Sequence, residues 1–256
     1  MGRAIDFFVN ELCVLDVSML PYPNMISTLT IFFQRYSRRP NSFQIKEIKK
    51  WFFCTGIAQR YSGRGYRKNI LNDVAFFNAL GLGGSVRFVL DELVDSFDIS
   101  RSIYSTRSSI TIVFYCLLVL QKPIYFENGN PMQMSNIAGE ANKRNRHHIF
   151  PQKFLQDIGV SRLYVNSILN IGLFPSDENR GFGSRPPVNY LAAFKAKRHF
   201  KKALDRHLIP AGVNSAIWST DERGFLIFIN QRRYMVCKAF EDAAGIKIFK
   251  NNILFR

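Results

Sequence analysis

Apolar side chains recur every three or four positions over the first half of the chain, which is the spacing of one face of an α-helix. This pattern predicts helices over residues 4–15, 20–36, 41–63, 67–81, 85–97 and 109–120. Asn41 and Ser42 are residues that cap helix N-termini, and Gly63 is a residue that ends helices. We therefore expect a helical bundle in this half of the chain.

The pattern changes near residues 122–130, where Asn128-Gly129-Asn130-Pro131 has the composition of a turn. Beyond it, a loop-like stretch reaches Asn166 and a short apolar run over residues 168–174 predicts a strand. An earlier strand is expected to end at His147–His148, and acidic residues after Ser176 favour a helix start. We therefore predict two domains, over residues 1–125 and 126–256, the second containing a small strand–loop–strand–helix unit.

Two further helices are expected over residues 188–210 and 222–245, the second ending at Gly245. The predicted fold class is therefore mainly α, a helical bundle with a small embedded β-containing motif.

The composition limits the kinds of partner and the cellular compartment that we expect for this chain. The chain has 35 Lys and Arg against 19 Asp and Glu, a net charge of +16, which favours a polyanion such as nucleic acid over an anionic membrane surface. Its four cysteines are scattered without a CxxC pair, which argues against a zinc ribbon and suits a reducing cytoplasm. The apolar run over residues 109–120 is too short to span a bilayer, and the N-terminus does not read as a signal peptide. We expect a soluble cytoplasmic protein with no membrane partner.

Two of the four histidines, His147 and His148, are adjacent in the sequence RHHIFPQKFL. Hydrolysis of a phosphodiester needs a proton acceptor for the attacking water, and a neutral imidazole suits that role. It also needs neutralisation of the growing negative charge, which a divalent cation with oxygen and imidazole ligands can supply. A histidine base with a second histidine and an amide near a metal would be a minimal set, and Asn170 and Asn179 are the candidate amides.

The run HHIFPQKFL…ILNIGLFPSDENRG…PPVNYL resembles the HNH (His-Me finger, ββα-metal) nucleases, over about residues 146–191. The form found in GmrSD-type modification-dependent restriction enzymes is the most similar, and the HNH domain of RNA-guided CRISPR nucleases has a similar run. The resemblance implies that His148 is the general base and that His147 and Asn179 are metal ligands. It implies that Asn170 ties the connecting loop and orients the base. Many relatives have aspartate at the position of His147, which tilts the expected metal from Mg²⁺ toward Mn²⁺.

The resemblance also implies a substrate and a larger protein. The expected function is a DNA endonuclease of restriction or phage defence, which nicks one strand per site. Related proteins usually begin with a ParB-like nucleotidase domain, and we expect this chain to be a piece that lacks it. The basic residues expected to contact DNA phosphates are Arg146, Arg180, Arg185, Lys195, Lys197, Arg198, Lys201 and Lys202.

Several alternatives stay open. One alternative is a DNA-binding or sensing module whose nuclease site is silent. Another is a nuclease that acts on RNA. Adjacent strand residues point to opposite faces, so His147 and His148 share a site only where the strand ends or twists. We interpret His199 and His207 as phosphate-facing or solvated. The loop over residues 60–68 is either a nucleic-acid contact or a solvated turn.

Overall fold

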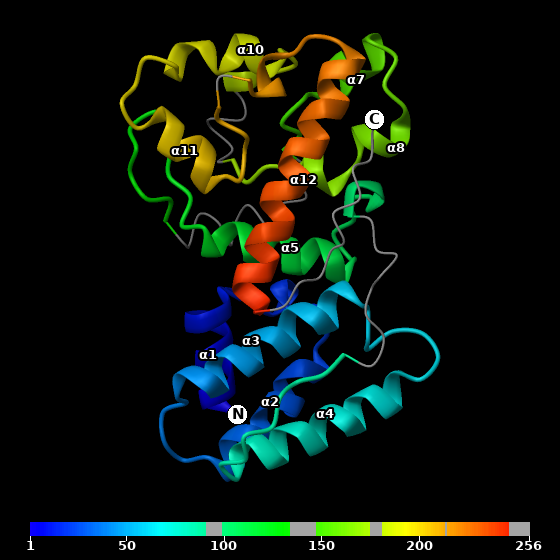
Figure 1. Ribbon diagram of the computed structural model, residues 1–256, viewed down its shortest axis with the longest axis vertical. Coiled ribbons are helices and arrows are strands. Elements are labelled where there is room, and N and C mark those ends of the chain that lie inside the picture. Colours follow the sequence, from blue (N-terminus) through cyan, green and yellow to red (C-terminus); the bar gives the residue numbers. More distant parts are fainter. Residues whose placement is uncertain (91–98, 134–146, 175–180, 213, 246–256) are drawn as a thin grey trace. The chain divides into compact units, whose positions relative to one another are not determined.

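The computed structural model describes residues 1–90, 99–133, 147–174, 181–212 and 214–245, and these are mainly helical (Figure 1). The described residues belong to two compact units. The first unit contains residues 1–90, 107–117 and 240–245. The second contains residues 99–106, 118–133, 147–174, 181–212 and 214–239. Each unit therefore combines stretches that are distant in the sequence.

The first unit is built from long helices. They are α1 (Gly2–Leu12), α2 (Asn24–Arg35), α3 (Ser42–Ile57), α4 (Tyr66–Gly81) and α5 (Ser109–Leu120) up to residue 117, with a short 3₁₀ turn at Val17–Met19. The first four confirm predicted helices: α2 and α3 are shorter than predicted, α1 is shifted toward the N-terminus, and α4 begins one residue early. α5 matches its prediction residue for residue. The helix predicted over residues 85–97 is wrong for residues 85–90, which are not helical, and the rest of it lies outside the described residues.

Asn41 starts α3 as the sequence predicts. Its side chain accepts a hydrogen bond from the Gln44 N–H at 2.9 Å, and the Gln44 side chain accepts one from the Asn41 N–H at 3.0 Å. This reciprocal pair is a capping box, which satisfies two backbone donors at the helix start. The boundary of α3 is therefore set locally by two side chains.

A buried carboxylate, Asp73 of α4, organises polar groups in the core of the first unit. It accepts hydrogen bonds from Trp51 Nε1 at 2.7 Å, from two nitrogens of Arg60 at 2.9 Å each, and from the Tyr61 hydroxyl at 2.7 Å. Burial and the neighbouring Asp73 carboxylate raise the pKa of Tyr61. The Arg60 guanidinium, which belongs to the same unit, thus compensates the charge of Asp73.

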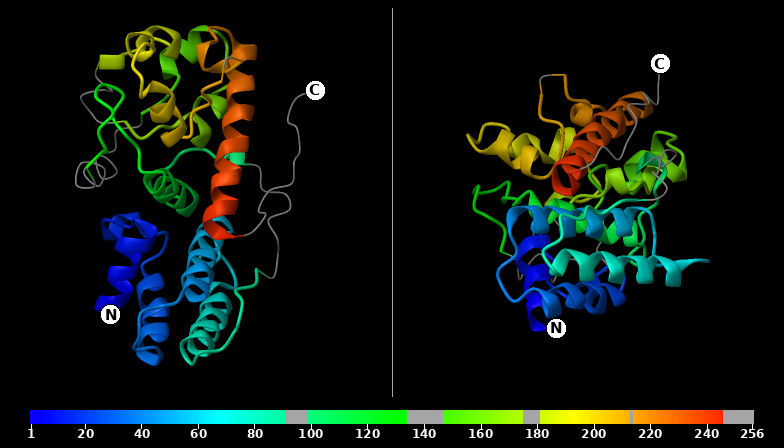
Figure 2. Two further views of the ribbon diagram at one scale, coloured as in Figure 1. Left: turned by 60° about the vertical axis from the view of Figure 1, so that its left-hand side comes forward. Right: turned by 60° about the horizontal axis from the view of Figure 1, so that its bottom comes forward.

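The second unit is built from short elements around one long helix. The short ones are α7 (Gln152–Asp157), α8 (Arg162–Val165), α10 (Pro187–Tyr190), α11 (Phe200–Arg206) and 3₁₀ turns at Ile99–Arg101, Ile168–Asn170, Ala192–Phe194 and Ala216–Trp218. The long one is α12 (Glu222–Ala244) up to residue 239, which is continuous in every view (Figures 1 and 2) and confirms the predicted helix. The loop expected up to Asn166 is wrong, since it holds α7 and α8. The single helix expected over residues 188–210 is also wrong, since that stretch is divided among α10, a 3₁₀ turn and α11.

The described residues contain no extended strand, and their β pairing consists of three isolated antiparallel bridges. One of them joins His148 to Ile171, the two segments that the sequence predicts as paired strands. The described part of the chain therefore has the predicted mainly α class but does not show a ββα motif. The helix expected to follow Ser176 begins outside the described residues. Within the described ranges, no helix is both long enough and apolar enough to cross a membrane.

Candidate active site around His148

The backbone of the histidine pair lies beside residues 170–172. The Ile149 N–H donates to the Asn170 carbonyl at 2.8 Å, and the Gly172 N–H donates to the His147 carbonyl at 2.8 Å. These two bonds flank the His148–Ile171 pair, which is the pattern of a non-hydrogen-bonded antiparallel pair with closely spaced side chains. Two parts of the chain that the sequence motif separates are thus adjacent in space.

This pairing determines the faces on which the two imidazoles start. Directly opposed residues share a face, so His148 lies on the face of Ile171. His147 precedes it and lies on the other face, opposite Gly172. His147 is buried, with 3% of its surface exposed, whereas His148 is half-buried. If both histidines contact one ligand, they approach it from two sides of the paired segment.

Asn170 is fully buried and holds the backbone that follows His148. Its Oδ1 accepts from the Phe150 N–H at 2.9 Å, and its Nδ2 donates to the carbonyls of Phe150 and Val165 at 3.0 Å each. Both amide hydrogens and one oxygen lone pair are therefore used on backbone groups. Asn170 has the geometry of a positioning side chain, because it contacts the framework and not solvent.

Two residues absent from the sequence-based site complete this framework. The Tyr190 hydroxyl donates to the Ile149 carbonyl at 2.8 Å, and both residues are buried. Arg232 Nη1 donates to the carbonyls on either side of Asn170, those of Leu169 at 2.6 Å and Ile171 at 2.7 Å. A signal for Arg232 exists in the sequence. It occupies the i+7 position of an apolar stripe that begins at Phe225, where a core residue is expected.

His207 is a buried core residue, so its interpretation as phosphate-facing or solvated is wrong. Its Nε2 lies 2.9 Å from the Ile124 carbonyl, and its ring stacks on Phe126 and packs against Phe174 at centroid distances of 5.0 and 5.5 Å. Burial, assisted by the nearby Arg232 charge, lowers the pKa of His207 to about 4, although the bond to Ile124 opposes the shift. The imidazole is therefore neutral at pH 7. His199 is half-buried, with Nε2 2.9 Å from the Phe126 carbonyl.

The basic residues expected to bind DNA divide into two groups. Three are engaged within the protein: Arg185 donates to the carbonyls of Phe182 and Gly181, Lys197 bonds to Glu127 at 2.5 Å, and Lys201 pairs with Asp205 at 2.8 Å. Three others, Lys195, Arg198 and Lys202, are exposed. Lys195 also lies over the Trp218 ring, at 4.7 Å from its centroid. Arg185 and Lys201 are exposed as well, so the two groups differ in their protein contacts and not in exposure.

Three expected site residues, Arg146, Asn179 and Arg180, lie outside the described residues. Of the two expected metal ligands, His147 alone is described. Within the described ranges, no group of three or more His, Cys, Asp or Glu side chains could hold a metal ion. The described residues therefore do not make a complete ligand set by themselves.

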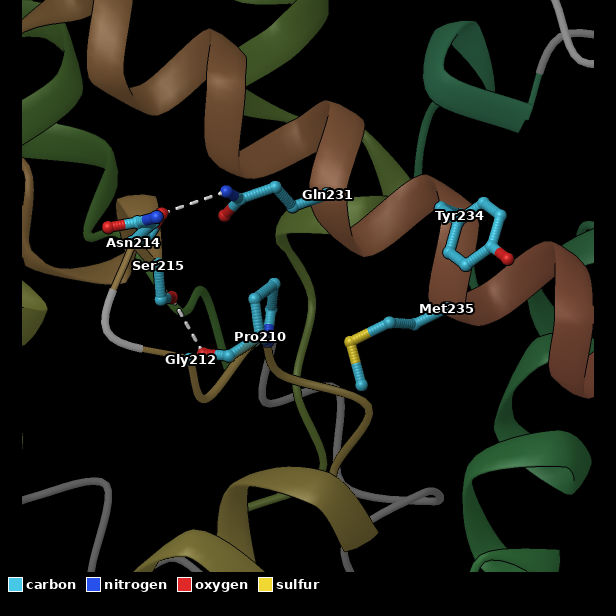
Figure 3. A pocket seen from close by; sticks show the side chains of 7 residues that line it. All are labelled: Pro210, Gly212, Asn214, Ser215, Gln231, Tyr234 and Met235. Atoms are coloured by element: carbon cyan, nitrogen blue, oxygen red, sulfur yellow. Dashed lines mark hydrogen bonds between the residues drawn. The ribbon is translucent and has the colours of Figure 1, made fainter.

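A separate pocket of about 530 Å³ lies against α12 (Figure 3). Its lining residues are Pro210, Gly212, Asn214, Ser215, Gln231, Tyr234 and Met235. None of these is a predicted site residue, and two polar side chains among them are already bonded within the wall. Gln231 Nε2 donates to the Asn214 carbonyl at 3.1 Å, and the Ser215 hydroxyl donates to the Pro210 carbonyl at 2.7 Å. The pocket is thus distinct from the site at His148.

Comparison with known proteins gives one distant relative. The chain is 23% identical to an uncharacterized protein of Methanocaldococcus jannaschii over 235 residues, which cover 84% of this chain and 38% of that protein. The chain thus spans well under half the length of this relative. No family model matches the sequence, and no solved structure matches it.

Proposed function

We propose that this chain is a metal-dependent HNH-type endonuclease that hydrolyses DNA phosphodiester bonds, with His148 as the general base. One observation carries the proposal. The His148–Ile171 pair, with Asn170 bonded across to Phe150, joins the two halves of the nuclease-like motif in one small framework. This pairing brings the histidine pair next to the motif's asparagine, as the proposed site requires.

The position of His148 suits a proton acceptor. The residue is half-buried, with ring Nε2 itself buried, and its backbone is held by the bridge. A neutral imidazole accepts a proton from water near neutral pH, which increases the nucleophilicity of the water toward phosphorus. Orientation matters in this step because an imidazole nitrogen must lie within hydrogen-bond distance of the attacking water.

Asn170 and Tyr190 supply that orientation in the proposed enzyme. Both bond to the backbone of residues 149 and 150, which directly follow His148. A rigid backbone reduces the number of positions that the His148 ring can occupy, so less of the barrier is spent on alignment. Neither side chain needs to contact the substrate for this role.

The proposed reaction uses a divalent cation, Mg²⁺ or Mn²⁺, which would be held by His147 and Asn179. Such an ion would supply neutralisation of charge on the phosphate and on the leaving oxygen. Of these two ligands, the described residues contain only His147. The role of His148 as proton acceptor does not depend on the ion. Histidine in the place of an oxygen ligand favours Mn²⁺ over Mg²⁺.

The proposed substrate is DNA, approached through basic residues of the second unit. Lys195, Arg198 and Lys202 are exposed and would neutralise backbone phosphates independently of sequence. Arg146 and Arg180 flank the proposed base and ligand in the sequence and would act nearer the cleaved bond. By analogy with restriction and phage-defence nucleases, the enzyme would act in the cytoplasm, where a ParB-like nucleotidase domain would be its partner.

The test is cleavage of supercoiled plasmid with Mg²⁺ or Mn²⁺, by the full chain and by His148→Ala, Asn179→Ala and Asn166→Ala. We expect nicked circles from the wild type, loss of nicking by about a hundredfold or more in His148→Ala, and loss in Asn179→Ala. Asn166→Ala is the matched control. The Asn166 side chain accepts from Gln152 Nε2 and donates to the Arg162 carbonyl in the neighbouring helices, so this variant should cut normally.

Each alternative has its own signature in this experiment. A wild type that shifts the plasmid on a gel but leaves it intact with every metal contradicts the enzyme and supports a sensing module. In a parallel reaction with RNA in place of the plasmid, cleavage of the RNA but not of the DNA contradicts the proposed substrate. Full activity in His148→Ala contradicts the assignment of the base.

A further inference from the structure

Arg232 is a fully buried arginine of α12 that bonds to two separate stretches of backbone. Its Nη1 donates to the carbonyls of Leu169 and Ile171, and its Nε donates to the carbonyl of Leu208 at 3.0 Å. A rigid guanidinium fork can hold three carbonyls in fixed directions, whereas a lysine ammonium is a point charge on a flexible stem. Arg232 therefore fixes the spatial relation of residues 169–171, residues 207–208 and α12.

The stretch that Arg232 holds is the one against which His148 is paired. Leu169 and Ile171 flank Asn170, whose own carbonyl accepts the Ile149 N–H, and Ile171 lies directly opposite His148. A shift of the 169–171 carbonyls would therefore move the Asn170 amide and the backbone of the histidine pair together. The side chain of Arg232 does not need to approach the substrate for this effect.

We infer that Arg232 is a positioning residue of the His148 site, acting through the 169–171 backbone. Its effect on catalysis rests on the proposed nuclease function, whereas the clamp on residues 169–171 does not. A buried cation is costly to desolvate, and an apolar side chain at this point of the α12 stripe would pack without that cost. The bonds to the carbonyls offset the cost of desolvation. They also define the position of residues 169–171, a segment whose β pairing is a single bridge.

The neighbouring Gln231 provides a matched control from the same helix. Its Oε1 accepts from the Ala216 N–H at 2.9 Å and its Nε2 donates to the Asn214 carbonyl, so it clamps a different loop to α12 (Figure 3). Removing this clamp weakens the attachment of α12 to the second unit without touching residues 169–171. A general weakening of the unit can thus be separated from a loss of positioning.

The experiment compares the full-length wild type, Arg232→Lys and Gln231→Ala in two measurements. The first is backbone hydrogen exchange by NMR at Ile149 and Gly172, with α3 amides as the internal reference. In Arg232→Lys we expect exchange at both amides to rise about tenfold or more, with α3 unchanged. The second is plasmid nicking, in which we expect kcat to fall about tenfold to a hundredfold and KM to stay within about twofold.

The outcomes separate the inference from the proposed function. Wild-type exchange at Ile149 and Gly172 in Arg232→Lys overturns the clamp, and so does equal loosening of these amides in Gln231→Ala. Loosened amides with unchanged kcat overturn the positioning role. A wild type that cannot nick DNA contradicts the proposed function, while loosened amides in Arg232→Lys would still support the clamp. If Arg232→Lys does not fold, NMR of the Arg232 guanidinium in the wild type provides the test. Distinct, slowly averaging Nη signals support the clamp, and signals of a freely rotating group overturn it.

Discussion

The two units differ in what their most buried polar side chains bond, although the first unit also has side-chain bonds to buried backbone, such as that of Glu47 to the Phe88 N–H. In the first unit, long helices bond their own backbone, and the buried carboxylate of Asp73 is bonded by side chains of Trp51, Arg60 and Tyr61. In the second unit, short elements leave backbone carbonyls and amides without regular partners, and buried side chains such as Asn170 and Arg232 bond to them. Buried backbone groups need partners wherever they lie, so a unit with little regular structure needs polar side chains in its core.

From this comparison we expect the largest loss of unfolding free energy when the charged side-chain network of the first unit is disrupted. Asp73→Ala would leave the Arg60 guanidinium and two further donors buried without their acceptor, and we expect a loss of about 3 to 5 kcal/mol in unfolding free energy. Urea unfolding followed by tryptophan fluorescence and circular dichroism measures it. Asp6→Ala, at an exposed position of α1, is the control and should change stability by less than about 0.5 kcal/mol. A small loss for Asp73→Ala would show that the first unit does not depend on its buried side-chain network.

A backbone-bonding side chain of the second unit should rank next. Asn170→Ala would leave the N–H and C=O of Phe150 and the C=O of Val165 without this partner, and we expect a loss of about 2 to 4 kcal/mol. The same urea titration measures it, with Asn166→Ala expected to lose less than about 1 kcal/mol because its partners lie nearer solvent. Equal losses in the two variants would show that the buried backbone of this unit does not depend on Asn170.

Acid should weaken the second unit through His207. The pKa of this imidazole falls from 6.5 to about 4 on folding, so between these values the unfolded chain binds a proton that the folded chain does not. Stability therefore decreases as the pH falls through this window, by about 3 kcal/mol in total. Unfolding free energies at about pH 7 and about pH 4.5 measure the loss. His207→Gln cannot titrate and should show a smaller pH dependence, and an unchanged dependence would contradict the shift.

The smallest effect is expected for a purely local feature of the first unit. Asn41→Ala removes the capping box of α3, and we expect a loss of about 1 kcal/mol in unfolding free energy. Asn41→Asp keeps an acceptor for the Gln44 N–H and should stay near the wild type, as measured by thermal and urea unfolding. A loss in Asn41→Ala as large as that in Asp73→Ala would mean that the first unit depends on its helix ends as much as on its buried network.

The same contrast explains how much of the molecule is predictable from sequence. The start of α3 and both ends of α12 are encoded locally, by apolar spacing, the Asn41 cap and the Gly245 end, and the sequence predicts them closely. The end of α3 is wrong, since the helix stops at Ile57, six residues before the predicted Gly63. The stretch that contains α10 and α11 reads as one helix, but the structure divides it because long-range packing overrides local propensity.

The candidate site also contains residues that the sequence predicts and residues that it does not. The motif predicts His148 and Asn170 from their order in the chain, and they lie in adjacent segments. Arg232 and His207 are harder to predict because arginine and histidine in basic surroundings read as solvated. Helical spacing provides a signal for His207 too, since Phe200, Ala203 and Leu204 of the same face are buried. What spacing cannot provide is the identity of the carbonyls that these side chains bond.

The Arg232 clamp also has a consequence for the time course of synthesis. The bonds that hold residues 169 and 171 come from a side chain 63 and 61 positions later in the chain. A ribosome therefore completes the histidine pair and its partner segment well before it adds the residue that fixes them, and contacts of such separation form late. We expect a nascent chain that stops short of α12 to carry a disorganised site, so that cutting activity would arise only once that helix has emerged.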